Sequence, residues 1–507
     1  MKFISNICSS LWPELSGEPK GRETQWSIDS SIRYPLLGMI KPAAFWFVVS
    51  LIFGLIASIK LHSPGFLGNC EWLTYGKVEP VFWNSLIYGW LFNAGLACAF
   101  WLLVRLGGAP AGNGFLLTVS LSIWNVALVV GLIGILIGGT LPLNWRESLT
   151  VSGQLPYEWL EMPPFIAPIL LASFIGMGLW GLLAFRERVH RASYASQWYV
   201  LAALFAFAWI YTAAQIMLIR EPSQGSLQYL VGSWYANNLL MIVIVPLALA
   251  CVYYLLPKTL GTPIVGYNHS GRAFWAWFIF ASCAGSAELI NGPIPAWVAT
   301  VGVIAAFGIL YPLTVFGIQF LSTLFANFTR IWDTLSLRFV LFGCIGFIVF
   351  GAYYIYGSLR STQEVAQFSS FSNGVQLLGL LGFASMIFSG FLYFILSRLL
   401  NKELPSAALA EIHFWMQLTG VLLLVSSLIT GGLQEGELMN GSAVSVLSIV
   451  VNLKSYYAMA SLGMFLLLLG AIAFLVSFTL FMFSTRSEKE ETGTLIGESP
   501  ELEASVS

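Results

Sequence analysis

The chain has 507 residues, of which 57% are hydrophobic and only 9% are charged, and its formal net charge is −1. Soluble domains carry about 25% charged residues, so most of this chain cannot face water and a soluble globular protein is excluded. The sequence also contains no basic tract suited to nucleic acid, no phosphate-binding loop and no dinucleotide-binding motif.

Apolar stretches of about 20 residues, the length that crosses a bilayer as a helix, recur along nearly the whole chain. They predict an all-α polytopic membrane protein with a cytoplasmic N-terminal segment at 1–35, a membrane domain at 36–485 and a disordered acidic cytoplasmic tail at 486–507. In chain order, the twelve predicted transmembrane helices are 36–61, 81–105, 114–139, 163–185, 198–220, 231–257, 271–291, 294–321, 338–357, 371–399, 406–432 and 456–484.

The distribution of Lys and Arg between the predicted loops indicates the orientation of the chain. With a cytoplasmic N-terminus, 17 of these residues fall on the inner side and 6 on the outer side. By the positive-inside rule, both termini are then cytoplasmic, and the longest outer loops are 62–80, 140–162 and 433–455. Because the six cysteines form no C-x-x-C pair, we expect neither covalent haem attachment nor a thiolate metal site.

Five stretches, in order, resemble subunit I of the haem–copper oxidase superfamily, and the cbb-type cytochrome c oxidases of bacteria in particular. They are WLTYGKVEPVFWNSLIYGW, SWYANNLLMIVIVPLALACVYYLLPK, FWAWFIFASCAGSAELINGPIPAWVATVG, FSNGVQLLGLLGF and EIHFWMQLTG, which begin at residues 72, 233, 274, 371 and 411. The resemblance covers about residues 30–485 and implies the twelve-helix arrangement of that subunit.

The resemblance also implies where the metal ligands of such an enzyme would lie, since the family uses six histidines for two haems and one copper. None of the six positions carries His in this chain. The haem-ligand positions are Phe82, Val375 and Leu377, and the copper-ligand positions are Asn237, Ala287 and Glu288. The position of the family's crosslinked tyrosine is Ala281.

The histidine count leads to the same expectation without any alignment. The chain has four histidines, of which His62, His190 and His269 lie in predicted loops and His413 lies near the cytoplasmic end of the eleventh span, where we expect it at the interface. Six imidazoles in mid-membrane cannot be assembled from these four. Axial methionine is the remaining route to a haem, through Met241, Met386 or Met416, although Met at helical spacing most often fills a core. We therefore expect no haem, copper or other metal.

Glu288 is a lone carboxylate among small and apolar residues, in the stretch AGSAELING. An ionisable group inside a membrane protein is a candidate for proton binding, and Asn237 is placed to donate a hydrogen bond to its protonated form. The alternative is structural, with Glu288 about one turn from the outer end of its span and reaching water or a loop. Asn84 and Asn238 are expected to form interhelical hydrogen bonds.

Three functions remain open. The first is a cofactor-free homologue of oxidase subunit I in the bacterial inner membrane, not itself catalytic, which serves as a membrane subunit of a respiratory complex. The second is a proton channel or permease that uses the emptied cavity. The third is a working terminal oxidase that oxidises cytochrome c and reduces oxygen. The resemblance implies other membrane subunits as partners, including a membrane-anchored c-type cytochrome, besides the lipid bilayer itself.

Overall fold

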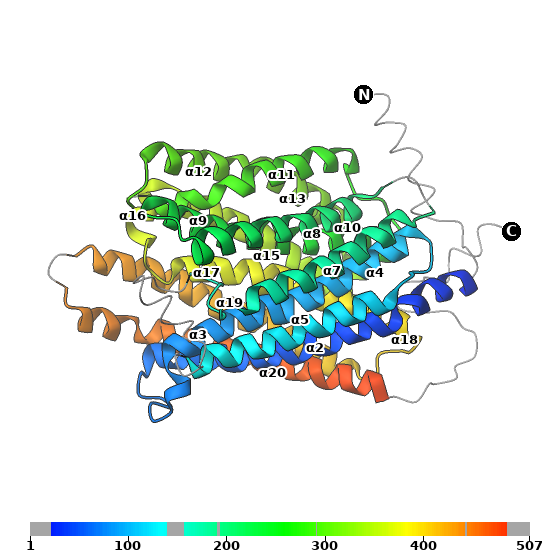
Figure 1. The fold of residues 1–507 in the computed structure, drawn as a ribbon, viewed down its shortest axis with the longest axis horizontal. Helices are drawn as coiled ribbons and strands as arrows, with labels where there is room; N and C mark the ends of the chain where they lie inside the picture. The colour runs from blue at the N-terminus through cyan, green and yellow to red at the C-terminus, as the bar shows by residue number, and fades with distance from the viewer. Residues whose placement is uncertain (1–21, 139–156, 190–192, 291, 442–443, 484–507) are drawn as a thin grey trace.

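A computed structural model describes residues 22–138, 157–189, 193–290, 292–441 and 444–483, with side chains from Ser27 onward. Within these ranges the chain forms a bundle of long, roughly antiparallel helices (Figure 1). The predicted N-terminal segment lies partly, and the predicted tail lies wholly, outside the described residues.

Eleven helices of the described chain are long and apolar enough to cross a membrane, and they coincide with eleven of the twelve predicted spans. In chain order the elements are α2 (Arg22–His62), α3 (Tyr75–Asn84) with α4 (Phe92–Gly107), α5 (Gly114–Ile137), α7 (Ile166–Arg186), α8 (Ala195–Ala214), α9 (Ser226–Asn238) with α10 (Val245–Leu260), α11 (Ser270–Ala284), α12 (Ala296–Gly308) with α13 (Leu310–Phe325), α14 (Phe328–Asp333), α15 (Leu335–Gly357), α16 (Arg360–Ala366), α17 (Phe371–Leu377) with α18 (Met386–Leu400), α19 (Ala407–Met439) and α20 (Val446–Phe483).

The seventh predicted span, 271–291, is a broken helix in the structure. Its α-helical part, α11, has only 15 residues and continues as the 3₁₀ turn Gly285–Leu289. At 1.5 Å per residue, α11 reaches only about 22 Å, which is less than the ~30 Å hydrocarbon core. The count of twelve uninterrupted spans is therefore not confirmed, because this span changes its helix type one turn before its end.

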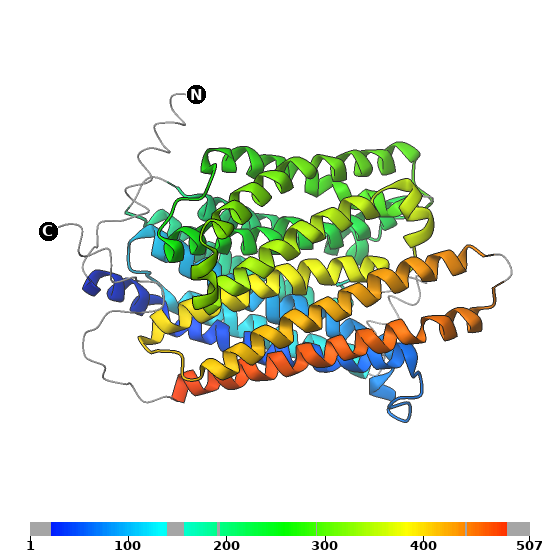
Figure 2. The ribbon, with the colours of Figure 1, turned by 180° about the vertical axis from the view of Figure 1, so that it is seen from behind.

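Two predicted boundaries are wrong. The first helix begins at Arg22 and runs through Pro35 and Pro42, 14 residues ahead of the predicted start at 36. The predicted outer loop 433–455 is largely helical, because α19 continues to Met439 and α20 begins at Val446. In both views the end of this helical pair projects past the neighbouring helices (Figure 1 and Figure 2).

Three helical segments form the centre of the bundle. These are Tyr75–Gly107, Ser226–Leu260 and Phe371–Leu400, and the most apolar stretch of each is entirely buried. Each contains a π-helical segment, at Ser85–Leu91, Leu239–Ile244 and Leu378–Ser385 respectively. The surrounding helices turn apolar side chains outward, as lipid contact requires, for example Val126, Leu179, Phe205 and Ile304.

We call the end of the bundle at which α2 ends and α3 begins the α2–α3 end. The starts of α9, α12, α17 and α20 and the ends of α15 and α19 lie at the same end (Figure 1). The candidate site lies here, because every helix that carries one of the predicted ligand positions presents it near this end.

Candidate functional site

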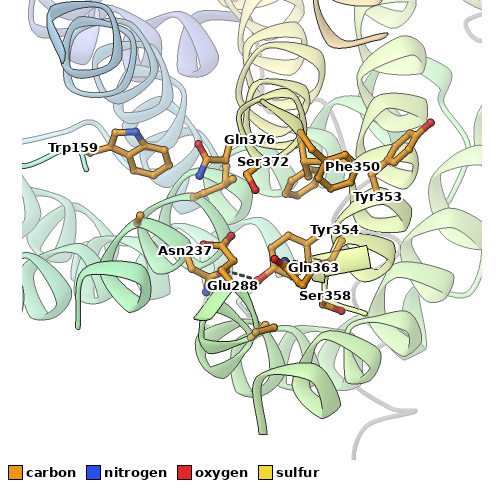
Figure 3. A pocket seen from close by; sticks show the side chains of 17 residues that line it. Trp159, Asn237, Glu288, Phe350, Tyr353, Tyr354, Ser358, Gln363, Ser372 and Gln376 are labelled. Atoms are coloured by element: carbon orange, nitrogen blue, oxygen red, sulfur yellow. Dashed lines mark hydrogen bonds between the residues drawn. The ribbon is translucent and has the colours of Figure 1, made fainter. Parts of the chain in front are cut away.

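The structure separates the six predicted ligand positions into two groups. Asn237, Ala287, Glu288 and Val375 all line one small cavity (Figure 3). Phe82 and Leu377 line a different and larger cavity.

Asn237 connects three helices. From α9, its Nδ2 donates to the backbone carbonyl of Ala281 on α11, at 2.8 Å. Its Oδ1 accepts a hydrogen bond from the Tyr354 hydroxyl on α15, at 2.6 Å (Figure 3). Ala281, at the position of the family's crosslinked tyrosine, therefore takes part through its backbone only. Nearby, Asn238 donates to the carbonyls of Trp234 and Ser282, which confirms its predicted interhelical role.

Glu288 interacts with Ser233 rather than with Asn237. The Ser233 hydroxyl lies 3.4 Å from Glu288 Oε2, and it also donates to the carbonyl of Gly285 at 2.7 Å. The Gln367 amide lies 3.4 Å from the backbone carbonyl of Glu288. The hydrogen bond expected between Asn237 and Glu288 is not formed, because Ala281 and Tyr354 are the partners of the Asn237 amide.

The smaller cavity has a volume of about 40 Å³. Because a water molecule occupies about 30 Å³ of liquid, this space holds one or a few waters, and it is far below the ~300 Å³ at which ligand pockets begin. Large side chains fill the remaining space, with Phe350, Tyr354 and Phe371 among the lining residues. Val375 is 6% exposed.

The larger cavity, of about 240 Å³, lies between α2, α3, α17, α19 and α20 at the α2–α3 end. Phe82 and Leu377 are 4% and 3% exposed and form part of its wall. The Phe82 ring packs directly on the backbone of α2 at Gly54, where an added Cβ would lie 2.8 Å from the ring. Glycine at position 54 thus leaves room for a phenyl ring at position 82.

The residues at these positions do not fit the haem and copper of the family. Phe82, Val375 and Leu377 offer no atom that coordinates iron, and Asn237, Ala287 and Glu288 offer copper no nitrogen ligand of the imidazole type. Among the described residues, no group of three or more His, Cys, Asp and Glu side chains could hold a metal ion.

The methionines considered as axial ligands do not line either cavity. Met241 and Met386 are almost completely buried in the core, as the core-filling interpretation predicts. The larger cavity does contain one methionine, Met464 on α20, whose Cε would lie 3.3 Å from a Cβ added at Gly54. The sequence alone gave no reason to select Met464. This residue lies beside Gly54 of α2 only because the last helix of the chain packs against the first helix described.

None of the three described histidines lines either cavity, and one of the three corrects a prediction. His62 and His269 lie at or between helix ends as predicted, and His190 lies outside the described residues. His413 was predicted at the interface, but it is completely buried. Its Nδ1 lies 3.1 Å from the Tyr393 hydroxyl, and four aromatic rings surround it, because this part of α19 packs against α15, α18 and α20.

Sequence reasoning missed two acids next to the smaller cavity. Glu161, in the segment between α5 and α7, accepts hydrogen bonds from the Asn84 amide at 2.6 Å and from the Trp159 backbone N–H at 3.0 Å. Burial raises the pKa of Glu161 to about 7, although these hydrogen bonds oppose the shift. Glu158 directly precedes Trp159, which lines the smaller cavity. Asn84, predicted to bond between helices, bonds instead to this loop.

The long apolar helices and the buried polar site at one end of the bundle place the chain in the class of polytopic α-helical membrane proteins. A family model described as "Cytochrome C and Quinol oxidase polypeptide I" matches residues 36–466. The chain belongs to this family of oxidase subunit I proteins.

Several curated relatives cover almost the whole chain at low identity. The cytochrome c oxidase subunit 1 homolog of Agrobacterium tumefaciens (strain T37) is 23% identical over 97% of this chain and 90% of the relative. The cytochrome c oxidase subunit 1 of Rhodobacter capsulatus is 24% identical over 92% and 88%. The cbb3-type cytochrome c oxidase subunit CcoN1 of Stutzerimonas stutzeri is 22% identical over 87% and 91%.

A solved structure of a heme-copper terminal oxidase dimer has the same fold. It matches this chain with a TM-score of 0.65 and 14% identity, over 93% of this chain and 86% of its own. The predicted haem–copper oxidase arrangement is thus confirmed as a fold, apart from the break in the seventh span.

Proposed function

We propose that this chain is a cofactor-free member of the oxidase subunit I family, which serves as an integral membrane subunit of a respiratory or redox complex and is not itself catalytic. The observation that carries this proposal is the packing at the predicted ligand positions. Phe82, Val375 and Leu377 are all at most 6% exposed. The cavity shared by Asn237, Ala287, Glu288 and Val375 holds about 40 Å³. A collapsed cavity with apolar side chains at the ligand positions suits a packed scaffold better than a cofactor site.

The test is a reduced-minus-oxidised optical spectrum of the purified protein, with iron and copper quantified on the same sample. We expect a flat spectrum and metal well below one equivalent per chain. A haem-containing membrane oxidase taken through the same purification is the control for cofactor loss. A haem band with near-stoichiometric iron would overturn the proposal and would point to a methionine-ligated haem, with Met464 as the first residue to replace.

A proton channel is the second candidate, and the position of Glu288 favours it. Glu288 lines the smaller cavity at the α2–α3 end. The small volume of this cavity argues against a continuous water path, and the most apolar stretch of each central helix is entirely buried. Proton flux into liposomes driven by a potassium gradient separates the candidates. Flux that is abolished by Glu288→Gln would support the channel, and no flux above empty liposomes supports the scaffold.

A working oxidase, the third function, requires that the chain consume oxygen with reduced cytochrome c. We expect no such activity from the purified chain, since it supplies four histidines in total.

The proposed role also requires partners. Affinity purification from native bacterial inner membranes should recover further membrane subunits, with a membrane-anchored c-type cytochrome as the expected one. Recovery of the chain alone, in gentle detergent, would contradict the role as a subunit.

A further inference from the structure

The larger cavity carries acidic side chains without a basic one. Glu79 on α3 and Glu435 on α19 both line it, and none of the described lining residues is Lys, Arg or His. Two basic residues of α2 at this end are engaged elsewhere. Lys60 donates to the carbonyl of Phe66 at 2.5 Å, and His62 Nε2 lies 3.1 Å from the Ser461 hydroxyl. The described lining of the cavity thus holds two acids and no basic side chain.

The two carboxylates face the same space. The backbone N–H and the hydroxyl of Ser370 each donate to Glu435 Oε2 at 2.9 Å, which fixes this carboxylate between α17 and α19. Tyr75 and Tyr457 line the same cavity as Glu79 and Glu435. A positive group in the mouth of the cavity would thus meet both acids at once.

Aromatic rings surround these acids. Tyr75, Phe82, Trp83, Phe368 and Tyr457 all line the cavity. Phe368 stands at the rim with 90% of its surface exposed, and its backbone has φ of 66°, a conformation that costs a non-glycine residue about 1–3 kcal/mol. Aromatic faces attract organic ammonium groups, and the attraction grows when the cation is desolvated.

The floor of the cavity is apolar, with Leu377, Leu424, Leu428 and Met464 opposite the acids. Its volume of about 240 Å³ equals that of about eight waters. This is somewhat below the ~300 Å³ at which ligand pockets usually begin, so the cavity suits only a small organic molecule. The cavity therefore complements an amphipathic ligand with a positive head. The carboxylates and aromatic rings would contact the head, and the aliphatic side chains would contact the apolar body.

We propose that the larger cavity binds a small organic cation, an amine or quaternary ammonium with an apolar body, whose charged head lies between Glu79 and Glu435. This inference rests on the proposed function, because a haem between Phe82 and Leu377 would fill the same space. The cavity then acts as a small-molecule site at the α2–α3 end.

The test measures binding of radiolabelled benzyltrimethylammonium to the full chain in nanodiscs by equilibrium dialysis, with neopentylbenzene as the uncharged molecule of the same shape. We expect saturable binding of the cation at one site per chain, and only unsaturable partition of neopentylbenzene into lipid. Glu435→Gln and Glu79→Gln should each weaken cation binding about tenfold. Glu437→Gln is the matched control, because Glu437 is an exposed acid on the same helix that does not line the cavity.

Thermal unfolding of each variant shows whether it is folded, so that lost binding is not mistaken for lost structure. Equal affinity of the Glu435→Gln and Glu437→Gln variants would overturn the inference, as would saturable binding of neopentylbenzene with the same affinity as the cation. An optical spectrum of the same sample keeps the two proposals apart. A haem band contradicts the proposed function, whereas a flat spectrum without cation binding contradicts this inference alone.

Discussion

Asn237 is the residue at which three helices of the candidate site meet, since α9, α11 and α15 are joined through its side-chain amide. Its two hydrogen bonds lie inside the bundle, where Asn237 is 7% exposed. Hydrogen bonds between membrane helices contribute about 0.6 kcal/mol each, so this residue stabilises the packing only modestly. It positions helices rather than ligands.

We expect Asn237→Ala to lower the free energy of unfolding by about 1 kcal/mol, because both hydrogen bonds are lost and the Ala281 carbonyl is left without a side-chain donor. Tyr354→Phe removes only one of the two bonds and should cost about half as much. Unfolding by SDS in mixed micelles measures both variants. If Tyr354→Phe costs as much as Asn237→Ala, the bond to Ala281 contributes nothing.

Glu161 makes the stability of the protein depend on pH. Its pKa is raised from 4.5 to about 7 in the folded protein, so the folded state binds the proton more tightly than the unfolded state. The contribution of this group to stability is therefore fully present below about pH 4.5 and declines as the pH rises to about 7.

We expect Glu161→Gln to raise the apparent melting temperature at pH 8 and to leave it nearly unchanged at pH 4.5. The amide cannot ionise, and its oxygen can still accept the hydrogen bond from Asn84. Melting curves at both pH values measure the effect, with Glu437→Gln as an exposed control. A variant that is less stable than the parent at pH 8 would show that the ionised carboxylate is the stabilising form.

At the scale of elements, glycines hold the long helices α19 and α20 together. An added Cβ at Gly463 on α20 would lie 2.6 Å from the backbone nitrogen of Leu424 on α19. One at Gly420 on α19 would lie 2.9 Å from the Gly463 carbonyl. Small residues allow membrane helices to approach to backbone contact, which is their main source of attraction in lipid.

We expect Gly463→Leu to force α19 and α20 apart and to lower stability by about 1–3 kcal/mol, as overpacking does elsewhere. Gly178→Leu is the matched control, because a Cβ at Gly178 on α7 would have nothing within 4 Å. The rate of proteolysis of the two variants in the membrane reports the separation of the helices. Equal resistance of both would mean that α20 can shift without loss.

The spans were predictable from the sequence, because the length of an apolar run is a local property that the bilayer fixes. The break after Ala284 was not, since a 3₁₀ turn depends on contacts with α9 and α12 and leaves the apolar pattern intact. The extension of α20 back to Val446 was also missed, because the prediction counted only residues needed to cross the membrane.

The site was partly predictable for a similar reason. The resemblance gave the positions Asn237, Glu288 and Val375, which do share a cavity. It could not reveal Glu161, because the contact of that residue with Asn84 spans 77 positions and leaves no periodic signal. His413 was misplaced because the position of a residue along a span does not tell whether it faces lipid or core.

For the molecule as a whole, the proposed orientation puts the α2–α3 end outside the cytoplasm. We expect a chain that retains only Cys70, in the segment between α2 and α3, to react with a membrane-impermeant maleimide in intact spheroplasts. A chain that retains only Cys98, which is buried, should stay unlabelled and serves as the control. Labelling of Cys70 only after lysis would reverse the orientation.

The π-helical segments in the three central helices divide the bundle into two levels along its length. In each case the wide turn separates the half that bears the predicted ligand positions from the half that packs at the other end. One extra residue in a turn rotates everything beyond it by about 100°, so each half can hold its own face toward the centre. Side chains in the half at the α2–α3 end can therefore be replaced, for example to design a binding site, while packing in the other half keeps the helices assembled.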